Sequence, residues 1–196
     1  FTTSTSITIN SRTDYTDAAS GIATSTLTRT TATLSNNTCG SFGSATVVAG
    51  TTAQTGLTTN CYQFTLVGTD NAGNAASIST IVKVDTAAPT GGAVTVNDTA
   101  ASGAGTSSFT GSGTVLINSR TDYTDTGSGL ASSTLTIASG TLTNNTCGSF
   151  GATTVIAGTT TQSGLTTGCY QFVLTGTDNA GGSASVSTTV KVDTSV

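Results

Sequence analysis

This chain repeats itself after 108 residues: residues 9–86 align with residues 117–194 without a gap, and 57 of the 78 aligned positions are identical. A period of this length is too long for a solenoid unit and corresponds to one whole domain per copy. The only proline, Pro89, lies between the copies in the stretch "DTAAPTGG", where small residues and proline indicate a linker. We therefore predict two domains with the same backbone, residues 1–87 and residues 88–196.

The composition and the spacing of apolar residues favour strands. Charged residues make up only 7% of the chain and the formal net charge is −4. Thr and Val are common, and their branched β-carbons fit a pleated sheet. Apolar and polar residues alternate in "CYQFTLVG" (residues 61–68) and in "ASISTIVKVD" (residues 76–85), and in the second stretch the alternation puts Lys83 and Asp85 on the outer face. Turn residues separate these stretches, so we predict an all-β fold, with each copy forming an antiparallel sandwich or barrel.

The four cysteines have the same spacing in both copies. Cys39 and Cys61 are 22 positions apart, as are Cys147 and Cys169. Four cysteines allow three pairings, and the repeat favours the two bonds within the copies, each stabilising its domain by roughly 3 kcal/mol in the chain-entropy model. Disulfides imply an oxidising location, outside the cell or in the periplasm. The alternatives are four reduced core cysteines or a zinc site, although the chain has no CxxC spacing and no histidine.

Several longer stretches resemble a known group of repeats. The end of the first copy, "CYQFTLVGTDNAGNAASISTIVKVDTAAPT", and the earlier stretches "TDAASGIATSTLT" and "NNTCGSFG" are similar to the bacterial immunoglobulin-like (Big-type) repeats of large secreted and cell-surface proteins. The resemblance implies two tandem immunoglobulin-like antiparallel β-sandwiches, used as a spacer, stalk, fibre or adhesin module without catalytic residues. The near absence of charge and the high threonine content depart from the usual pattern of these repeats.

The residue types present argue against several classes of function. Without histidine the chain has no Ser-His-Asp triad, and "GIATS" is not a nucleophile elbow, so we do not expect an enzyme. Five basic residues cannot form the cationic surface that nucleic-acid binding needs. No apolar run approaches the length of a membrane span. No signal peptide is visible, which suggests a mature or excised segment.

The aspartates are the candidate metal ligands, because all nine acidic residues are aspartate and eight of them recur in the repeat. Turn-like segments rich in oxygen ligands, "DYTD" and "TDNAGN", suit calcium. The alternative, which we prefer, is that aspartate and asparagine shape these turns through hydrogen bonds to the backbone, so that no cofactor is required. An Arg–Asp surface pair beside "TDYTD" is also expected. The calcium candidates are Asp14, Asp17, Asp70, Asp122, Asp125 and Asp178.

Covalent modification is a further possibility that the sequence raises. The Asn-x-Thr sites at Asn36, Asn97 and Asn144 are possible glycan acceptors in a secreted chain, and exposed threonine and serine could carry O-linked sugar. Lys83 and Lys191 recur in the last strand of each copy. They could form an isopeptide bond to asparagine, or could protect a sheet edge against unwanted pairing.

We expect a structural protein of an extracellular or cell-surface fibre or stalk, with copies of itself or neighbouring repeats as partners; the alternative is an adhesin that binds glycan or a host surface. One strand is expected in the second copy but not in the first. "GAVTVN", residues 92–97, reads as the opening strand of the second sandwich, and the first copy has no counterpart because Phe1 aligns with Phe109. The first sandwich should therefore have an open edge. Either upstream sequence or a neighbouring subunit supplies its strand, and the second case would link chains into a filament.

Overall fold

The computed structural model describes residues 1–195, and all regular secondary structure in that range is β-strand. Within it we find no helix of the length and apolarity that a membrane crossing requires. The contacts divide the chain into two compact units. Unit 1 contains Phe1–Ala87, Thr126–Gly129 and Asn179–Gly182, and unit 2 contains Ala88–Asp125, Leu130–Asp178 and Ser183–Val196.

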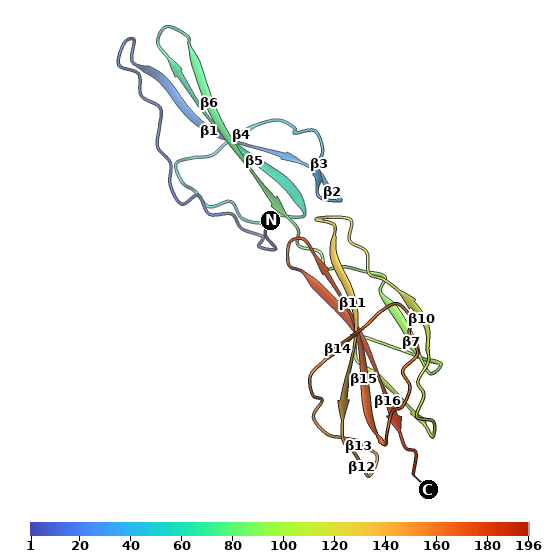
Figure 1. Cartoon of the computed structure of the whole chain (residues 1–196). Helices are drawn as coiled ribbons and strands as arrows, with labels where there is room; N and C mark the ends of the chain where they lie inside the picture. Colours follow the sequence, from blue (N-terminus) through green and yellow to red (C-terminus); the bar gives the residue numbers. More distant parts are fainter. Residues whose placement is uncertain (196) are drawn as a thin grey trace. The chain divides into compact units, whose positions relative to one another are not determined.

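Unit 1 contains one four-stranded antiparallel sheet and one short hairpin (Figure 1). The strands of the sheet, in spatial order, are β4 (Thr46–Val47), β1 (Ile22–Ala32), β5 (Asn60–Asp70) and β6 (Ala75–Val84). The hairpin is formed by β2 (Leu34–Ser35) and β3 (Thr38–Cys39). The residues before β1 run beside this sheet as an irregular segment, coloured blue in Figure 1.

Unit 2 contains an equivalent sheet with one additional strand, an equivalent hairpin, and a second sheet. Its five-stranded sheet has the order β14 (Thr154–Ile156), β11 (Leu130–Gly140), β15 (Gly168–Asp178), β16 (Ser183–Val192) and β9 (Thr106–Thr110), with β9 parallel to β16. The second sheet has the order β10 (Ile117–Thr121), β7 (Ala93–Val96) and β8 (Thr99–Ala100). The hairpin is β12 (Leu142–Thr143) with β13 (Thr146–Cys147).

The two copies of the repeat use the same strand register. Leu27 of β1 is opposite Leu66 of β5, and the equivalent Leu135 of β11 is opposite Leu174 of β15. Each long pair is also irregular near its beginning, between Ile22 and Thr24 in one copy and between Leu130 and Ser132 in the other. The recurrence follows from the sequence, because a shift of one residue would turn every apolar side chain to the opposite face.

The cores lie where the alternating pattern predicts them. In unit 2 the core lies between the two sheets, with Val94, Val96 and Ile117 of the three-stranded sheet packed on residues of the five-stranded sheet that include Phe172 and Leu174. In unit 1 the main core contains Leu27, Val48, Leu57, Tyr62, Phe64, Leu66 and Val84. The prediction of an all-β fold with antiparallel sheets is therefore confirmed.

The placement of Asp85 on the outer face was wrong. The residue is fully buried, because Gly127 and Ser128 of unit 1 pack against its carboxylate and the Ser128 amide donates to its Oδ2. The equivalent Asp193, which also follows the end of its strand, is exposed. The Asp85 carboxylate accepts hydrogen bonds from the Thr59 hydroxyl and the Ala87 amide, both at 3.1 Å. The side chain thus closes the end of the sheet instead of facing solvent beside Lys83.

The two units differ in the opening strands. The predicted strand at residues 92–97 is present as β7, which spans Ala93–Val96, and unit 2 continues through β8 to β9. Among the described residues, unit 1 has no counterpart of β7 and β8, and only Phe1 and Thr2 correspond to β9, with Thr2 forming a single bridge to Val84. The consequence is visible in an identical stretch, "INSRTDYTD": residues 117–121 form strand β10 against β7, whereas residues 9–13 are assigned no strand.

Candidate functional site: an open groove on unit 1

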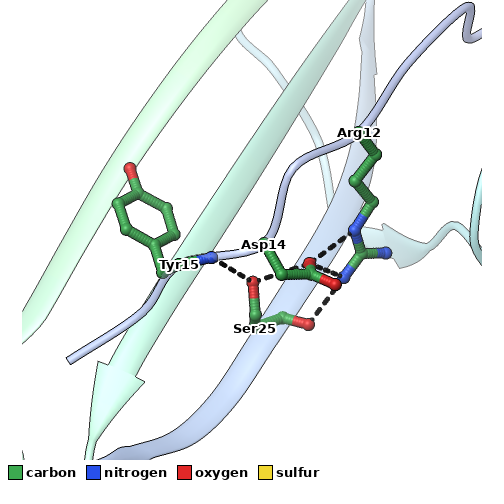
Figure 2. A network of polar contacts seen from close by, with 4 residues as sticks. All are labelled: Arg12, Asp14, Tyr15 and Ser25. Atoms are coloured by element: carbon green, nitrogen blue, oxygen red, sulfur yellow. Dashed lines mark hydrogen bonds and ion pairs between the residues drawn. The ribbon is translucent and has the colours of Figure 1, made fainter. Parts of the chain in front are cut away.

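A polar network fastens the irregular segment of unit 1 to strand β1 (Figure 2). Arg12 donates from Nε to Asp14 Oδ1 and from a terminal nitrogen to the Ser25 carbonyl oxygen, both at 2.7 Å. The Ser25 hydroxyl donates to Asp14 Oδ1 at 2.9 Å and accepts from the Tyr15 amide at 3.3 Å. Figure 2 shows the Tyr15 ring pointing away from this network. Four residues of the repeat thus hold the segment against the sheet.

The same network recurs in unit 2. Arg120 donates to Asp122 Oδ1 and to the Ser133 carbonyl, both at 2.9 Å. Hydrogen bonds from the arginine, followed by those from the serine, lower the pKa of the Asp14 and Asp122 carboxyls below the ordinary value of 3.8. Each carboxylate forms an ion pair with the arginine two residues before it, which is the Arg–Asp pair expected beside "TDYTD".

Asp17 and Asp70 serve as acceptors inside turns. Asp17 Oδ2 accepts the amide hydrogens of Ala19, Ser20 and Gly21. Asp70 accepts from the amides of residues 72 and 74, and the Asn74 side chain donates to its second oxygen at 2.9 Å. The hydrogen bonds from Asn74 are the main reason that the pKa of Asp70 is lowered. These contacts are those expected of aspartates that shape turns.

Asp125 and Asp178 of unit 2 are both buried, and a carboxylate oxygen of one lies within 4.8 Å of a carboxylate oxygen of the other. Of the six calcium candidates, these two are brought together in unit 2, whereas Asp122 is engaged by arginine. Two close carboxylates repel each other when both are charged. The two carboxylates are oxygen ligands of the kind that hard cations prefer.

The disulfides close a small second core on the other side of β5. Cys39 is bonded to Cys61 and Cys147 to Cys169, with Cα–Cα separations of 5.8 and 5.7 Å. This is the pairing that the repeat favours. In unit 1 the cluster contains Ala32, Leu34 and the fully buried Cys61, with Cys39 and Phe42 packed against it. The bond therefore ties the β2–β3 hairpin to the central strand of the sheet.

The three Asn-x-Thr sites all lie at the start of two-residue hairpin loops. Asn36, Asn97 and Asn144 have φ values of 45°, 44° and 46°, and each loop joins two paired strands. Asparagine tolerates this left-handed conformation, which explains its presence there without a glycan.

The two recurring lysines bind two of these hairpin loops, β2–β3 and β12–β13. Lys83 donates to the carbonyl and side-chain oxygens of Asn37 at 2.6 and 2.8 Å, and Lys191 makes the equivalent bonds to Asn145. Lys83 also lies 5.3 Å from the ring centroid of Phe1, and Lys191 lies 5.0 Å from that of Phe109. Each lysine thus joins the end of the last strand to a hairpin loop of its own copy.

Unit 1 carries an apolar groove of about 520 Å³. One wall is the irregular segment 7–13, the floor comes from β1 and β5, and the other wall is β6. Its apolar lining is formed by Ile7, Ile9, Leu27, Phe64, Leu66, Ile78 and Val82. Strand β6, which forms the other wall, is the last strand of its sheet. Among the described residues its outer edge pairs with other backbone only at a single parallel bridge between Thr2 and Val84. The groove therefore lies between two lengths of backbone whose hydrogen-bonding capacity is largely unused.

The equivalent surface of unit 2 is covered. Thr80 is exposed, whereas its counterpart Thr188 is fully buried. Ile78 is 64% exposed, whereas its counterpart Val186 packs against the core. The cover is β7, which pairs with β10, and β9, which pairs with β16.

No family model matches the chain, and no curated protein matches it.

Sequence reasoning anticipated an open edge but not this groove. The signal was the missing counterpart of residues 92–97. What could not be read from the sequence is that the irregular segment stays in place without a strand partner, because that depends on the Arg12 network and on its distant contact with Ser25.

Proposed function

We propose that the chain is a non-enzymatic structural segment of an extracellular filament, stalk or cell-surface protein, built from disulfide-stapled immunoglobulin-like repeats that are joined by strand donation. The observation that carries this proposal is the twofold occurrence of one disulfide-bonded sheet in the same register. Duplication of a whole domain extends a protein without adding a new active site. The resemblance to bacterial immunoglobulin-like repeats supports the same reading.

The environment in which the chain works is proposed from its disulfides. Cys61 and Cys169 are fully buried and both bonds close local loops. Bonds of this kind form and persist in oxidising surroundings. Threonine and serine, not charged groups, supply much of the polar surface, which suits a protein that packs beside other chains because little charge repulsion opposes the packing.

Adhesion receives less support from the side chains. A glycan-binding site would need aromatic residues free in the loops, whereas the recurring Tyr62 and Phe64 are buried in the core and Phe42 packs beside the disulfide. Phe1 and Phe109 are exposed, but each lies beneath a lysine of its own copy. We therefore propose a structural role rather than recognition of a sugar.

Immunogold electron microscopy of the source cells, with an antibody raised against this chain, tests the proposal. We expect label along appendages or at the outer surface. Label confined to the cell interior would contradict both the extracellular location and the structural role. Peptide mapping of the native protein without reduction provides the second readout, and free thiols would argue against an oxidising location.

A further inference from the structure

The groove of unit 1 has a template for its occupant inside the same chain. Five of the seven apolar lining residues recur unchanged in unit 2, and Ile7 and Ile78 are replaced by Val115 and Val186. There the space is filled by Val94 and Val96 of β7, which are 2% and 0% exposed. The side chains of β7 contact the core that contains Phe172 and Leu174, and their counterparts in unit 1, Phe64 and Leu66, line the groove. Unit 2 therefore shows what kind of segment closes a surface of this composition.

The groove is built before anything occupies it. The network of Arg12, Asp14 and Ser25 holds one wall to β1. Tyr15 packs against Gly68 of β5, where a Cβ would be 2.5 Å from its ring. The other wall, β6, is paired with β5 along its whole length. A binding surface fixed in advance loses little entropy when a partner arrives.

The occupant must be an extended polypeptide with a defined side-chain pattern. Transferring the pairing of β7 with β10 to unit 1 places a valine opposite Ile9 and a second valine opposite Arg12, antiparallel to the irregular segment. A glycine must precede them, because a Cβ on Gly92 would lie 2.2 Å from the Tyr123 ring and Tyr15 is the counterpart of Tyr123. The required pattern is Gly-x-Val-x-Val.

The second part of the occupant runs beside β6. In unit 2 residues 106–108 pair in parallel with Thr188, Thr189 and Val190, so the equivalent partners in unit 1 are Thr80, Ile81 and Val82. Phe1 and Thr2 already occupy the positions of Phe109 and Thr110, since Thr2 bridges Val84 as Thr110 bridges Val192. A segment equivalent to residues 92–108 fills the remaining space without displacing them.

We propose that the groove of unit 1 binds an extended segment of the pattern Gly-x-Val-x-Val, donated by a neighbouring polypeptide. This inference rests on the proposed function and identifies its joining surface. The donor is not residues 92–108 of a second folded copy, because Val94 and Val96 are already buried in their own unit and their transfer would open an equal surface there. Main-chain hydrogen bonds to two edges supply affinity, and the alternate side chains supply selectivity.

The test uses the whole chain and a synthetic peptide with the sequence of residues 92–108. We expect saturable binding by calorimetry, with hydrogen-exchange protection appearing at residues 9–13 and 78–82. A peptide carrying Val94→Asp and Val96→Asp should bind at least about tenfold more weakly, because it would bury two charges. A peptide carrying Gly92→Leu should also lose affinity, because its side chain meets Tyr15.

A matched pair of variants of the chain locates the site. Ile78→Asp lies in the groove and should abolish binding, whereas Val47→Asp, on the opposite edge of the sheet, should leave binding unchanged. Both residues are exposed, at 64% and 73%, so neither change should unfold the unit. Loss of binding in both variants, or in neither, would overturn the assignment.

Two further outcomes separate other occupants. Concentration-dependent dimers that disappear in Ile78→Asp would show that a second copy fills the groove. A chain with residues 92–108 fused before Phe1 tests covalent filling: protection of residues 9–13 in the fusion, without binding of the free peptide, would overturn donation between polypeptides. Immunogold label at the cell surface without peptide binding would refute only the donation of a strand to the groove. Peptide binding with immunogold label in the cell interior would refute the extracellular role.

Discussion

The ring of Tyr15 lies against the backbone of Gly68 so closely that a Cβ on Gly68 would be 2.5 Å from the ring atom Cγ. Tyr123 and Gly176 have the same relationship in unit 2, with a distance of 2.4 Å to Cγ. Glycine at this position of the central strand lets the segment before the first long strand rest on the sheet. The contact thus depends on two residues 53 positions apart in each copy.

We predict that Gly68→Ala destabilises unit 1 by about 1–3 kcal/mol, because the methyl group overpacks the tyrosine contact. Urea denaturation followed by circular dichroism measures the change. Gly43→Ala is the control, since the nearest atom to its Cβ would be the Thr31 carbonyl oxygen at 3.7 Å. Equal stability of the two variants would show that the ring does not need this glycine.

The limits of sequence reasoning are clearest in "INSRTDYTD". Both copies contain these nine residues, and only the second forms a strand with them, because β7 is present there to pair with. Any rule based on local sequence must give both stretches the same answer. The alternation of Tyr62, Phe64 and Leu66, by contrast, does predict the central strand, because the pattern is local and one face is buried.

The candidate site could be predicted only in part for the same reason. The repeat showed that the first copy has no counterpart of residues 92–97, and this predicted an open edge in the first sandwich. It could not reveal the second core beside Cys61 or the buried Asp85. The second core forms because a hairpin covers the outer face beside Cys61, and Asp85 is buried because residues 127 and 128 cover its carboxylate. Neither contact follows from the spacing of residues within a strand.

We predict that replacing Cys39 and Cys61 with serine lowers the free energy of unfolding of unit 1 by roughly 3 kcal/mol. The bond closes a 22-residue separation and anchors the β2–β3 hairpin. Replacing Cys147 and Cys169 should cost unit 2 a similar amount. Calorimetry of both double variants measures the two losses. A loss below about 0.5 kcal/mol would show that the hairpin is held by packing alone.

We predict that acid weakens both units through the Arg–Asp networks. The folded-state pKa values of Asp14 and Asp122 are lowered below 3.8 by hydrogen bonds from arginine and serine. Their contribution to stability is therefore present above about pH 4 and is lost as the pH falls through the lowered folded-state values.

The variant Asp14→Asn with Asp122→Asn tests this acid dependence. Its free energy of unfolding should be lower than that of the native chain at pH 7, and the difference should shrink between pH 4 and pH 2. Arg12→Gln with Arg120→Gln should reduce the same acid-dependent difference, because it removes the donor that lowers the pKa. If the free energies of unfolding of the native chain and the aspartate variant differ by the same amount from pH 4 to pH 2, the two aspartates do not cause the acid dependence.

The last prediction compares equivalent leucines in the two cores. Leu174 is fully buried beneath β7, whereas Leu66 lines the open groove of unit 1. Leu174→Ala should cost about 2–5 kcal/mol, because the void is enclosed. Leu66→Ala should cost less, because its void opens to the groove and water can enter. Val155→Ala and Val47→Ala, on the outer strands β14 and β4, are the solvent-exposed controls and should change stability by less than about 0.5 kcal/mol. Equal losses for the two leucines would mean that the groove is closed in solution, and addition of the 92–108 peptide should raise the cost of Leu66→Ala toward that of Leu174→Ala.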